Sequence, residues 1–407
     1  MLLPKELKTN TLNQKMIVIA CTLLAIIVSL APYQADSTLG SDAFRSVTRI
    51  LSYLLTVILI IGLITNHKKI DVGVLIPIVY WFITTFNVYG REQLQLSLLN
   101  IIILICIFLV PRDLGLGVIK LFRKYMVIIC FLGIVCYIAY FFKLGLPYKI
   151  VPYYSSLFGE QYYANYGVSF IYIKSVQVRL CGLFNEPGFL GTVCALLICL
   201  DKANFKRITN WIIFIGGCLS FSLAFLLILA IYISLISIKK KSVLLLVILF
   251  MIFYFFILPK INFNNYALDY LVQRITLSGG GFFGNDRSNV LLDSAFSSLF
   301  QSDKVLFGYG GGYSSQLTSG VSTYKTMIID YGFVGCILMY GSLLLYALAK
   351  YKNNWFNFCF TVVFFLSVYQ RPGIFIATYF VIFLFGHIYI QMAEKKSVGN
   401  NEVGEIA

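Results

Sequence analysis

Long apolar segments without a single charge constrain this chain more than any other feature. Stretches such as 187–200 and 222–238 contain no ionisable side chain except cysteine and tyrosine. Only 12% of the 407 residues are charged, against about 25% in soluble domains, and the mean hydropathy is +0.85. A bilayer core needs ~20 apolar residues per helix and a backbone that satisfies its own hydrogen bonds. Because the apolar runs are continuous rather than alternating, they predict an all-α polytopic membrane protein.

We expect a single integral membrane domain over residues 1–407 with about twelve transmembrane helices. The first of them could instead be the apolar core of a signal peptide, because Lys5, Lys8 and Lys15 precede it. The expected spans are residues 16–31, 50–65, 72–89, 94–110, 125–142, 187–200, 208–220, 222–238, 242–258, 328–349, 355–370 and 372–393.

The lysines indicate how these spans are oriented. They gather in alternate short connections, such as 66–71, 111–124 and 239–241, and in the C-terminal tail 394–407. By the positive-inside rule, this distribution places both termini in the cytoplasm of a multi-pass protein of the cytoplasmic (inner) membrane. The net charge of +15 is therefore a signal of topology, and it does not indicate a nucleic-acid partner.

Two connections are much longer than the others, and both fall on the external, periplasmic side. They cover about residues 143–186 and 259–327. Loops longer than ~12–15 residues are usually functional or disordered, and the tyrosine, phenylalanine and glycine in these two favour folded surface structure. We expect them to contain short helices, with helical apolar spacing at 265–276 and 288–300.

Arginines favour the external side, which has seven of the ten (Arg45, Arg49, Arg91, Arg179, Arg274, Arg287 and Arg371). Orientation requires only a positive charge, whereas the planar guanidinium also binds phosphate or carboxylate in a bidentate manner. The bias indicates an anionic external ligand. Contact with lipid headgroups or pairing with external acids explains any one arginine equally well.

The segment from Arg179 to Gly188 combines an arginine, a glutamate and a helix-starting proline. Pro187 suits the first turn of an apolar helix, and a carboxylate at Glu186 is favoured by the positive end of that helix. One interpretation is a helix cap with Arg179 as its partner. The other makes Arg179 an anion ligand and Glu186 a general base for a hydroxyl nucleophile.

The second loop offers further candidate ligands. Arg287 lies at the expected start of the 288–300 helix, where an arginine beside free N–H groups suits a phosphate, and Arg274 precedes a flexible glycine run. Glycines interleaved with Tyr309 and Tyr313 suit sugar stacking or a plain turn. No spacing of cysteine and histidine suggests a metal site, since the only histidines are His67 and His387.

These features resemble the Wzy-type O-antigen polymerases and the related O-antigen ligases, membrane glycosyltransferases of the GT-C kind. Four features support the resemblance: the many spans with two large external loops, Arg179-x-x-Gly182-x-Phe184-x-Glu186-Pro187, Arg287 followed by the 306–310 sequence Leu-Phe-Gly-Tyr-Gly, and the 330–335 sequence Asp-Tyr-Gly-Phe-Val-Gly. They cover residues 140–350; the rest matches by hydropathy alone.

The resemblance implies a metal-independent glycosyltransferase that polymerises polyprenyl-diphosphate-linked oligosaccharide repeat units into O-antigen or a similar surface polysaccharide. It needs no cofactor. Arg179, Glu186 and Arg287 are then the candidate catalytic residues. The candidate diphosphate- and substrate-binding residues are Arg274, Tyr309, Tyr313, Lys325 and Asp330.

Two other functions stay open. Ligases typically have a histidine after the glycine segment, whereas this chain has Ser-Thr-Tyr-Lys-Thr at 322–326, which favours a polymerase and leaves Glu186 as the first choice of base. A lipid-linked oligosaccharide flippase fits twelve spans, but long arginine-bearing loops and scarce intramembrane charges disfavour it. The expected partners are the lipid-linked oligosaccharide as donor and acceptor, the bilayer and a chain-length regulator.

Overall fold

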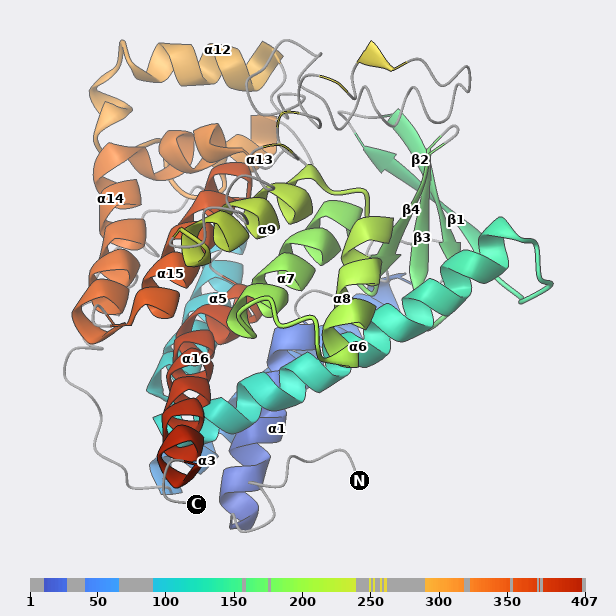
Figure 1. Ribbon diagram of the computed structural model, residues 1–407. Helices are drawn as coiled ribbons and strands as arrows, with labels where there is room; N and C mark the ends of the chain where they lie inside the picture. The colour runs from blue at the N-terminus through green and yellow to red at the C-terminus, as the bar shows by residue number, and fades with distance from the viewer. Residues whose placement is uncertain are drawn as a thin grey trace.

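A computed structural model describes residues 11–27, 41–65, 91–155, 159–174, 177–238, 290–317, 323–351, 354–371 and 376–404, with residues 249, 252, 257, 260–261 and 373 (Figure 1). Helices dominate this part of the chain. They are α1 (Leu12–Ile27), α3 (Ser41–Thr65), α5 (Arg91–Leu109), α6 (Arg112–Phe141), α7 (Pro187–Leu200), α8 (Ile208–Leu219), α9 (Leu223–Ile236), α12 (Val290–Leu299), α13 (Tyr313–Leu317), α14 (Tyr324–Tyr351), α15 (Trp355–Gln370) and α16 (Ala377–Gly404).

Ten of the twelve predicted spans coincide with helices of the structure, while 72–89 and nearly all of 242–258 lie outside the described residues. Among the described residues, three helical segments are long and apolar enough to cross a membrane by length and composition: Ser46–Thr65, Arg112–Phe141 and Tyr324–Leu348. The other apolar helical segments, such as Asn100–Leu109 and Ala377–Ala393, contain 10–17 residues within the described part of the chain. The structure thus supports the prediction of a membrane protein, whereas the number of twelve transmembrane helices stays a prediction.

Helix α6 is longer than the sequence analysis predicted. Residues 111–124 were expected to form a connection, but α6 begins at Arg112 and runs without a break to Phe141. Leu114, Val118 and Leu121 recur at helical spacing and are buried, so this charged segment has an apolar face of its own. The structure extends α6 by 13 residues ahead of the predicted span 125–142.

The first long loop corrects the all-α prediction. It contains four antiparallel strands in the order β1-β2-β3-β4, and not the short helices we expected. The strands are β1 (Lys149–Ser155), β2 (Gly159–Asn165), β3 (Phe170–Lys174) and β4 (Gln177–Gly182). Residues such as Ile171, Tyr172 and Val178 favour strands because branched and aromatic side chains pack well on a pleated surface. Hydropathy, which indicated the helices, does not detect the two-residue alternation of strands as short as these.

Each face of this sheet contains a cluster of buried side chains. On one face Tyr163, Phe170, Tyr172 and Cys181 form a small cluster. On the other, Ile171 packs with Ala164 and with residues of α6. The sheet is therefore fixed against the end of α6 and the start of α7, as Figure 1 shows.

Helix α7 is the centre of the helical bundle. Every one of its 14 residues is buried, and its neighbours are α8, α9, α15, α16 and strand β4. It has no polar face, which is typical of a helix enclosed on all sides. Its N-terminus consequently has a fixed place beneath the sheet.

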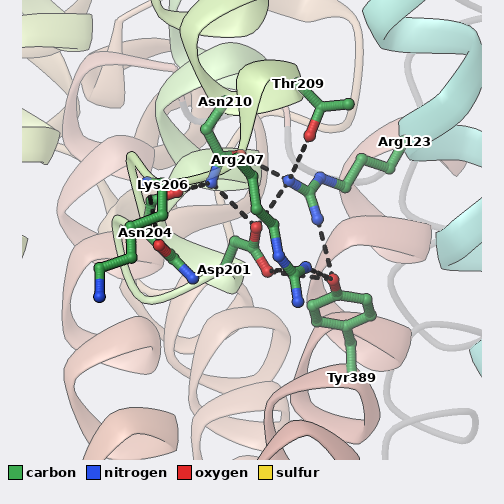
Figure 2. Close-up of polar contacts among 8 residues, drawn as sticks. All are labelled: Arg123, Asp201, Asn204, Lys206, Arg207, Thr209, Asn210 and Tyr389. Carbon is green, nitrogen blue, oxygen red and sulfur yellow. Dashed lines mark hydrogen bonds and ion pairs between the residues drawn. The ribbon is translucent and has the colours of Figure 1, made fainter.

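A polar network joins α6, α16 and the turn after α7 (Figure 2). Arg123 donates to Asp201 at 2.8 Å and to Tyr389 at 2.8 Å. Arg207 also pairs with Asp201 at 2.8 Å, and Asn210 donates to it at 2.9 Å. Burial alone would raise the pKa of the Asp201 carboxyl, but the two arginines outweigh this effect and hold that pKa below its ordinary value of 3.8.

The second long loop ends in a close backbone contact with α14. Gly332 has φ 66° and kinks this helix, and the chain at Leu306–Gly312 docks on the kink. Tyr309 N donates to Ile329 O at 2.8 Å, and Val334 N donates to Leu306 O at 3.0 Å. The expected 288–300 helix is confirmed as α12, whereas the expected 265–276 helix lies outside the described residues.

Gly308 allows this contact, and Gly308→Ala should disrupt it. Gly308 has φ 72°, and an added Cβ would lie 2.4 Å from the Asp330 carbonyl oxygen. We expect a loss of more than about 2 kcal/mol in the free energy of unfolding, because backbone must move as well as adopt a strained φ. Thermal unfolding in detergent measures it. The control is Gly145→Ala, where φ is 74° and no atom lies within 4 Å, so only the roughly 1–2 kcal/mol conformational cost applies; equal losses in the two variants would contradict the docking argument.

Asp201 should make the stability of the protein depend on acid pH. A carboxyl with a lowered folded-state pKa stabilises the fold above its unfolded value and loses that contribution as pH falls through the folded value. The gap in melting temperature between the wild type and Asp201→Asn should therefore be largest at neutral pH and narrow below pH 3.8. A gap that stays constant down to pH 3 would show that the network does not lower this pKa.

Candidate functional site

The N-terminus of α7 is held by residues on both sides of the helix start. Glu186 is extended, with φ −138° and ψ 142°, and Pro187 occupies the first turn, where its missing N–H leaves no donor unsatisfied. The Glu186 carbonyl accepts from Phe189 N at 3.1 Å. Tyr163 of the sheet donates to the Asn185 carbonyl at 2.8 Å. The sheet thereby fixes the point at which the chain enters the bundle.

Glu186 forms an ion pair with Arg371, a residue that lies between α15 and α16. Arg371 Nη2 is 2.6 Å from Glu186 Oε2. The glutamate side chain is 34% exposed and the arginine side chain only 9%, so the pair presents its carboxylate outward. Burial alone would lower the pKa of Arg371, but the Glu186 carboxylate raises it above its ordinary value, which keeps the guanidinium charged.

Arg371 is held in position by its own surroundings. Its guanidinium carbon lies 5.9 Å from the centre of the Phe189 ring, within cation–π range. Its backbone N–H donates to Ser367 O at 2.9 Å and closes the last turn of α15. The arginine therefore fixes the orientation of the Glu186 carboxylate relative to α15 as well as α7.

Arg179 reaches from β4 to the turn between α8 and α9. Its Nε donates to Ser220 O at 2.9 Å and its Nη2 donates to Phe221 O at 3.0 Å. These carbonyls follow the last residue of α8, Leu219, and carbonyls at a helix end have no partner within their helix. Arg179 is buried, with 6% of its surface exposed. It caps the C-terminus of α8, while its roles as a partner of the α7 cap and as an anion ligand stay predictions.

This turn lies directly against α7. A Cβ on Gly191 would be 2.5 Å from the Ser222 Cβ and 2.7 Å from the Ser220 Oγ. Gly191 is on the second turn of α7, five residues after Glu186 and two after Phe189. Arg179 and Arg371 therefore approach the first two turns of one helix, from the sheet and from the α15–α16 connection.

The candidate residues of the second loop form a separate cluster. Asp330 accepts from Ser314 N at 2.7 Å, from Ser314 Oγ at 3.0 Å and from Gly312 N at 3.1 Å. Lys325 Nζ is 2.7 Å from Asp293 of α12. These contacts position α12, α13 and the glycine segment on α14, and the substrate-binding role of Asp330 and Lys325 stays a prediction.

Tyr309 and Tyr313 stack on each other. Their ring centres are 4.7 Å apart and their planes differ by 23°. Both rings are half-buried, so the glycine segment forms an ordered turn with an aromatic pair on its surface. Arg274 and Arg287, the two remaining candidates, lie outside the described residues.

Arg371 is a partner of Glu186 that the sequence patterns did not indicate. It was counted among the external arginines but received no role. The 370–373 sequence Gln-Arg-Pro-Gly between two apolar helices was the available signal, because a buried arginine at a break needs an acid nearby. Identifying Glu186 as that acid would have required knowledge of a contact between two residues that are 185 positions apart in the sequence.

Arg179→Ala should destabilise the fold. The change leaves two carbonyls without the donors that they have now, and each buried unsatisfied group costs roughly 1–3 kcal/mol, so we expect a loss of about 3 kcal/mol in the free energy of unfolding. Arg179→Lys should recover part of it, since an ammonium retains donors and charge. The control is Arg112→Ala at an exposed helix start. A wild-type melting temperature for Arg179→Ala in detergent would contradict the capping role.

Comparison with models of protein families, with curated proteins and with solved structures finds no match to this chain.

Proposed function

We propose that this protein is a multi-pass glycosyltransferase of the cytoplasmic membrane that polymerises polyprenyl-diphosphate-linked oligosaccharide repeat units. The two long loops would lie on the external face and both termini in the cytoplasm. The proposal rests on the resemblance of the sequence motifs and on the geometry at the N-terminus of α7. The proposed product is O-antigen or a similar surface polysaccharide.

One observation supports this function best: Glu186 presents a partly exposed carboxylate at the entry of α7, fixed by a buried arginine. A general base must be accessible to its substrate and oriented by a further group. Glu186, 34% exposed against 9% for Arg371, meets both conditions. The residue also lies at the junction of the first long loop and the bundle, where an external lipid-linked sugar would approach.

The proposed step transfers a glycan to a sugar hydroxyl. The hydroxyl oxygen of the acceptor attacks the anomeric carbon of the donor, and the bond from that carbon to the diphosphate oxygen breaks. Glu186 accepts the hydroxyl proton, and the polyprenyl diphosphate departs with the electron pair of the broken bond. Atoms and charge balance without a metal or a nucleotide.

The arginines would have two kinds of role. Arg371 and Arg179 are positioning residues, because the former orients Glu186 and the latter holds the α8–α9 turn against α7. The diphosphate ligands would be Arg287 and Arg274, since guanidinium groups there could stabilise the leaving group electrostatically. The paired rings of Tyr309 and Tyr313 would offer a surface to a sugar.

Glu186→Gln tests the base. Glutamine is nearly isosteric and its amide oxygen can still accept from Arg371, but the buried guanidinium loses its counter-charge. The melting temperature should therefore fall, and it is measured in the same variant. A removed general base typically lowers the rate about 10²–10⁴-fold, and cells dependent on this variant should display single-repeat glycan in place of long chains. Gel separation of extracted surface glycan gives the chain-length distribution.

Arg112→Gln, at the exposed start of α6, is the matched control and should retain long chains. Long chains with Glu186→Gln would reject the base assignment. In a strain lacking the gene, finished polymer left on its polyprenyl carrier would identify a ligase. Repeat units accumulating on the cytoplasmic face would identify a flippase instead.

A further inference from the structure

Ten consecutive residues, from the last residue of α6 through the following loop to the start of β1, are all exposed. They are residues 141–150, which we call the 141–150 segment. Six of its side chains are large and apolar, and three of them are more than 60% exposed: Phe141, Phe142 and Leu144. Leu146, Tyr148 and Ile150 are each more than 40% exposed. A contiguous apolar patch of this kind marks an interaction site.

The patch continues an exposed stripe on α6. Ile128, Phe131, Val135 and Ile138 recur every three or four residues along the helix, and each is about two-fifths to one-half exposed. On a helix this spacing forms a single face. Because α6 is one of the helices able to cross a membrane, the face is the part of it that lipid would cover. The 141–150 segment extends that face onto the loop and into β1.

The length of α6 places the segment at the edge of the bilayer. Its uncharged part, from Tyr125 to Phe142, contains 18 residues and spans about 27 Å as a helix. A hydrocarbon core is ~30 Å thick, and α6 runs obliquely to α1 and α16 in Figure 1, which shortens its reach across the bilayer. Apolar residues after Phe142 are therefore needed to complete the crossing.

The charges and aromatics of the segment match the interface rather than the core. Lys143 and Lys149 are the only charged residues in it, both are exposed, and long cationic side chains extend toward lipid phosphates from such positions. Tyr148 packs against Tyr140 and Tyr166, with ring centres 5.6 and 5.2 Å apart. Tyrosines gather where one end of the ring is apolar and the other is wet.

We propose that the 141–150 segment is a lipid-binding surface that rests in one leaflet, with its apolar side chains at the top of the acyl chains and Lys143 and Lys149 on anionic phospholipid headgroups. It anchors the four-stranded sheet to the membrane. This surface is independent of the reaction proposed for the α7 site. Lipid is the occupant because the patch is continuous with the lipid-facing stripe of α6 and complements an anionic headgroup in charge.

Tryptophan depth measurements test the surface in the full-length protein reconstituted into phospholipid vesicles. The variant is Leu144→Trp, and the fluorescence of Trp81, Trp211 and Trp355 is subtracted with the wild type. We expect bromine near the carbonyl end of the acyl chain to quench the added tryptophan more strongly than bromine near the methyl end. The matched control is Gln316→Trp on α13, also an exposed position, and its fluorescence should not be quenched.

The outcomes distinguish lipid from other occupants. Quenching of Leu144→Trp no greater than that of Gln316→Trp would overturn the proposal, and an unquenched but blue-shifted Leu144→Trp would indicate a protein partner or a second copy instead. Stronger quenching from the methyl end would place the segment in the core and also overturn it.

The headgroup preference has its own test. Brominated phosphatidylglycerol should quench Leu144→Trp more than brominated phosphatidylcholine does, and this ratio should fall to one when Lys143 and Lys149 are both replaced by glutamine. A ratio of one before the lysines are changed would reject the anionic headgroup. All these positions are exposed, so the variants should keep the wild-type melting temperature.

Discussion

The structure around α7 depends on two hydrogen bonds from Arg179 to the carbonyls of Ser220 and Phe221. Helices α8 and α9 contain only 12 and 14 residues, so they correspond to about 18 and 21 Å, less than a ~30 Å hydrocarbon core. Their connecting turn is largely buried, with Ser220 and Ser222 0% and 6% exposed, so water has little access to its backbone. The Arg179 guanidinium, which comes from the sheet, supplies the donors. In apolar surroundings, irregular backbone is tolerated only where the protein itself provides such hydrogen-bond partners.

Three charged side chains around α7 are each combined with opposite charges or with backbone dipoles. Asp201 has two arginines, Glu186 has Arg371, and Arg179 has two carbonyls. Breaking such a combination leaves a buried charge uncompensated, which costs about 3–5 kcal/mol. Loss of activity on mutating one of these arginines is accordingly weak evidence of catalysis, unless stability is measured in the same variant.

How far the sequence predicts this structure varies from element to element. The span 187–200 matches α7 at both ends, because Pro187 starts the helix and the uncharged run ends at Asp201. The sheet was missed because its strands are short and apolar residues such as Ile171 and Tyr172 lie on both of its faces, which leaves no regular alternation of apolar and polar residues. Glu186 and Arg179 were identified as important, but their partners were not, since Arg371 and Ser220 come close only in three dimensions. The length of helix α6 was underestimated because the charged residues of its first half made this segment look like a connection, although it also has an apolar face.

The pairing of Glu186 with Arg371 also sets an order of assembly. The two residues are separated by 185 positions, so ribosomes complete β4, α7 and most of the bundle before the arginine exists. Until then the carboxylate at the head of α7 has no guanidinium from the α15–α16 connection. The entry to α7 is thus finished by one of the last segments to be synthesised, and a chain truncated before residue 371 would contain the sheet and α7 without the group that orients Glu186.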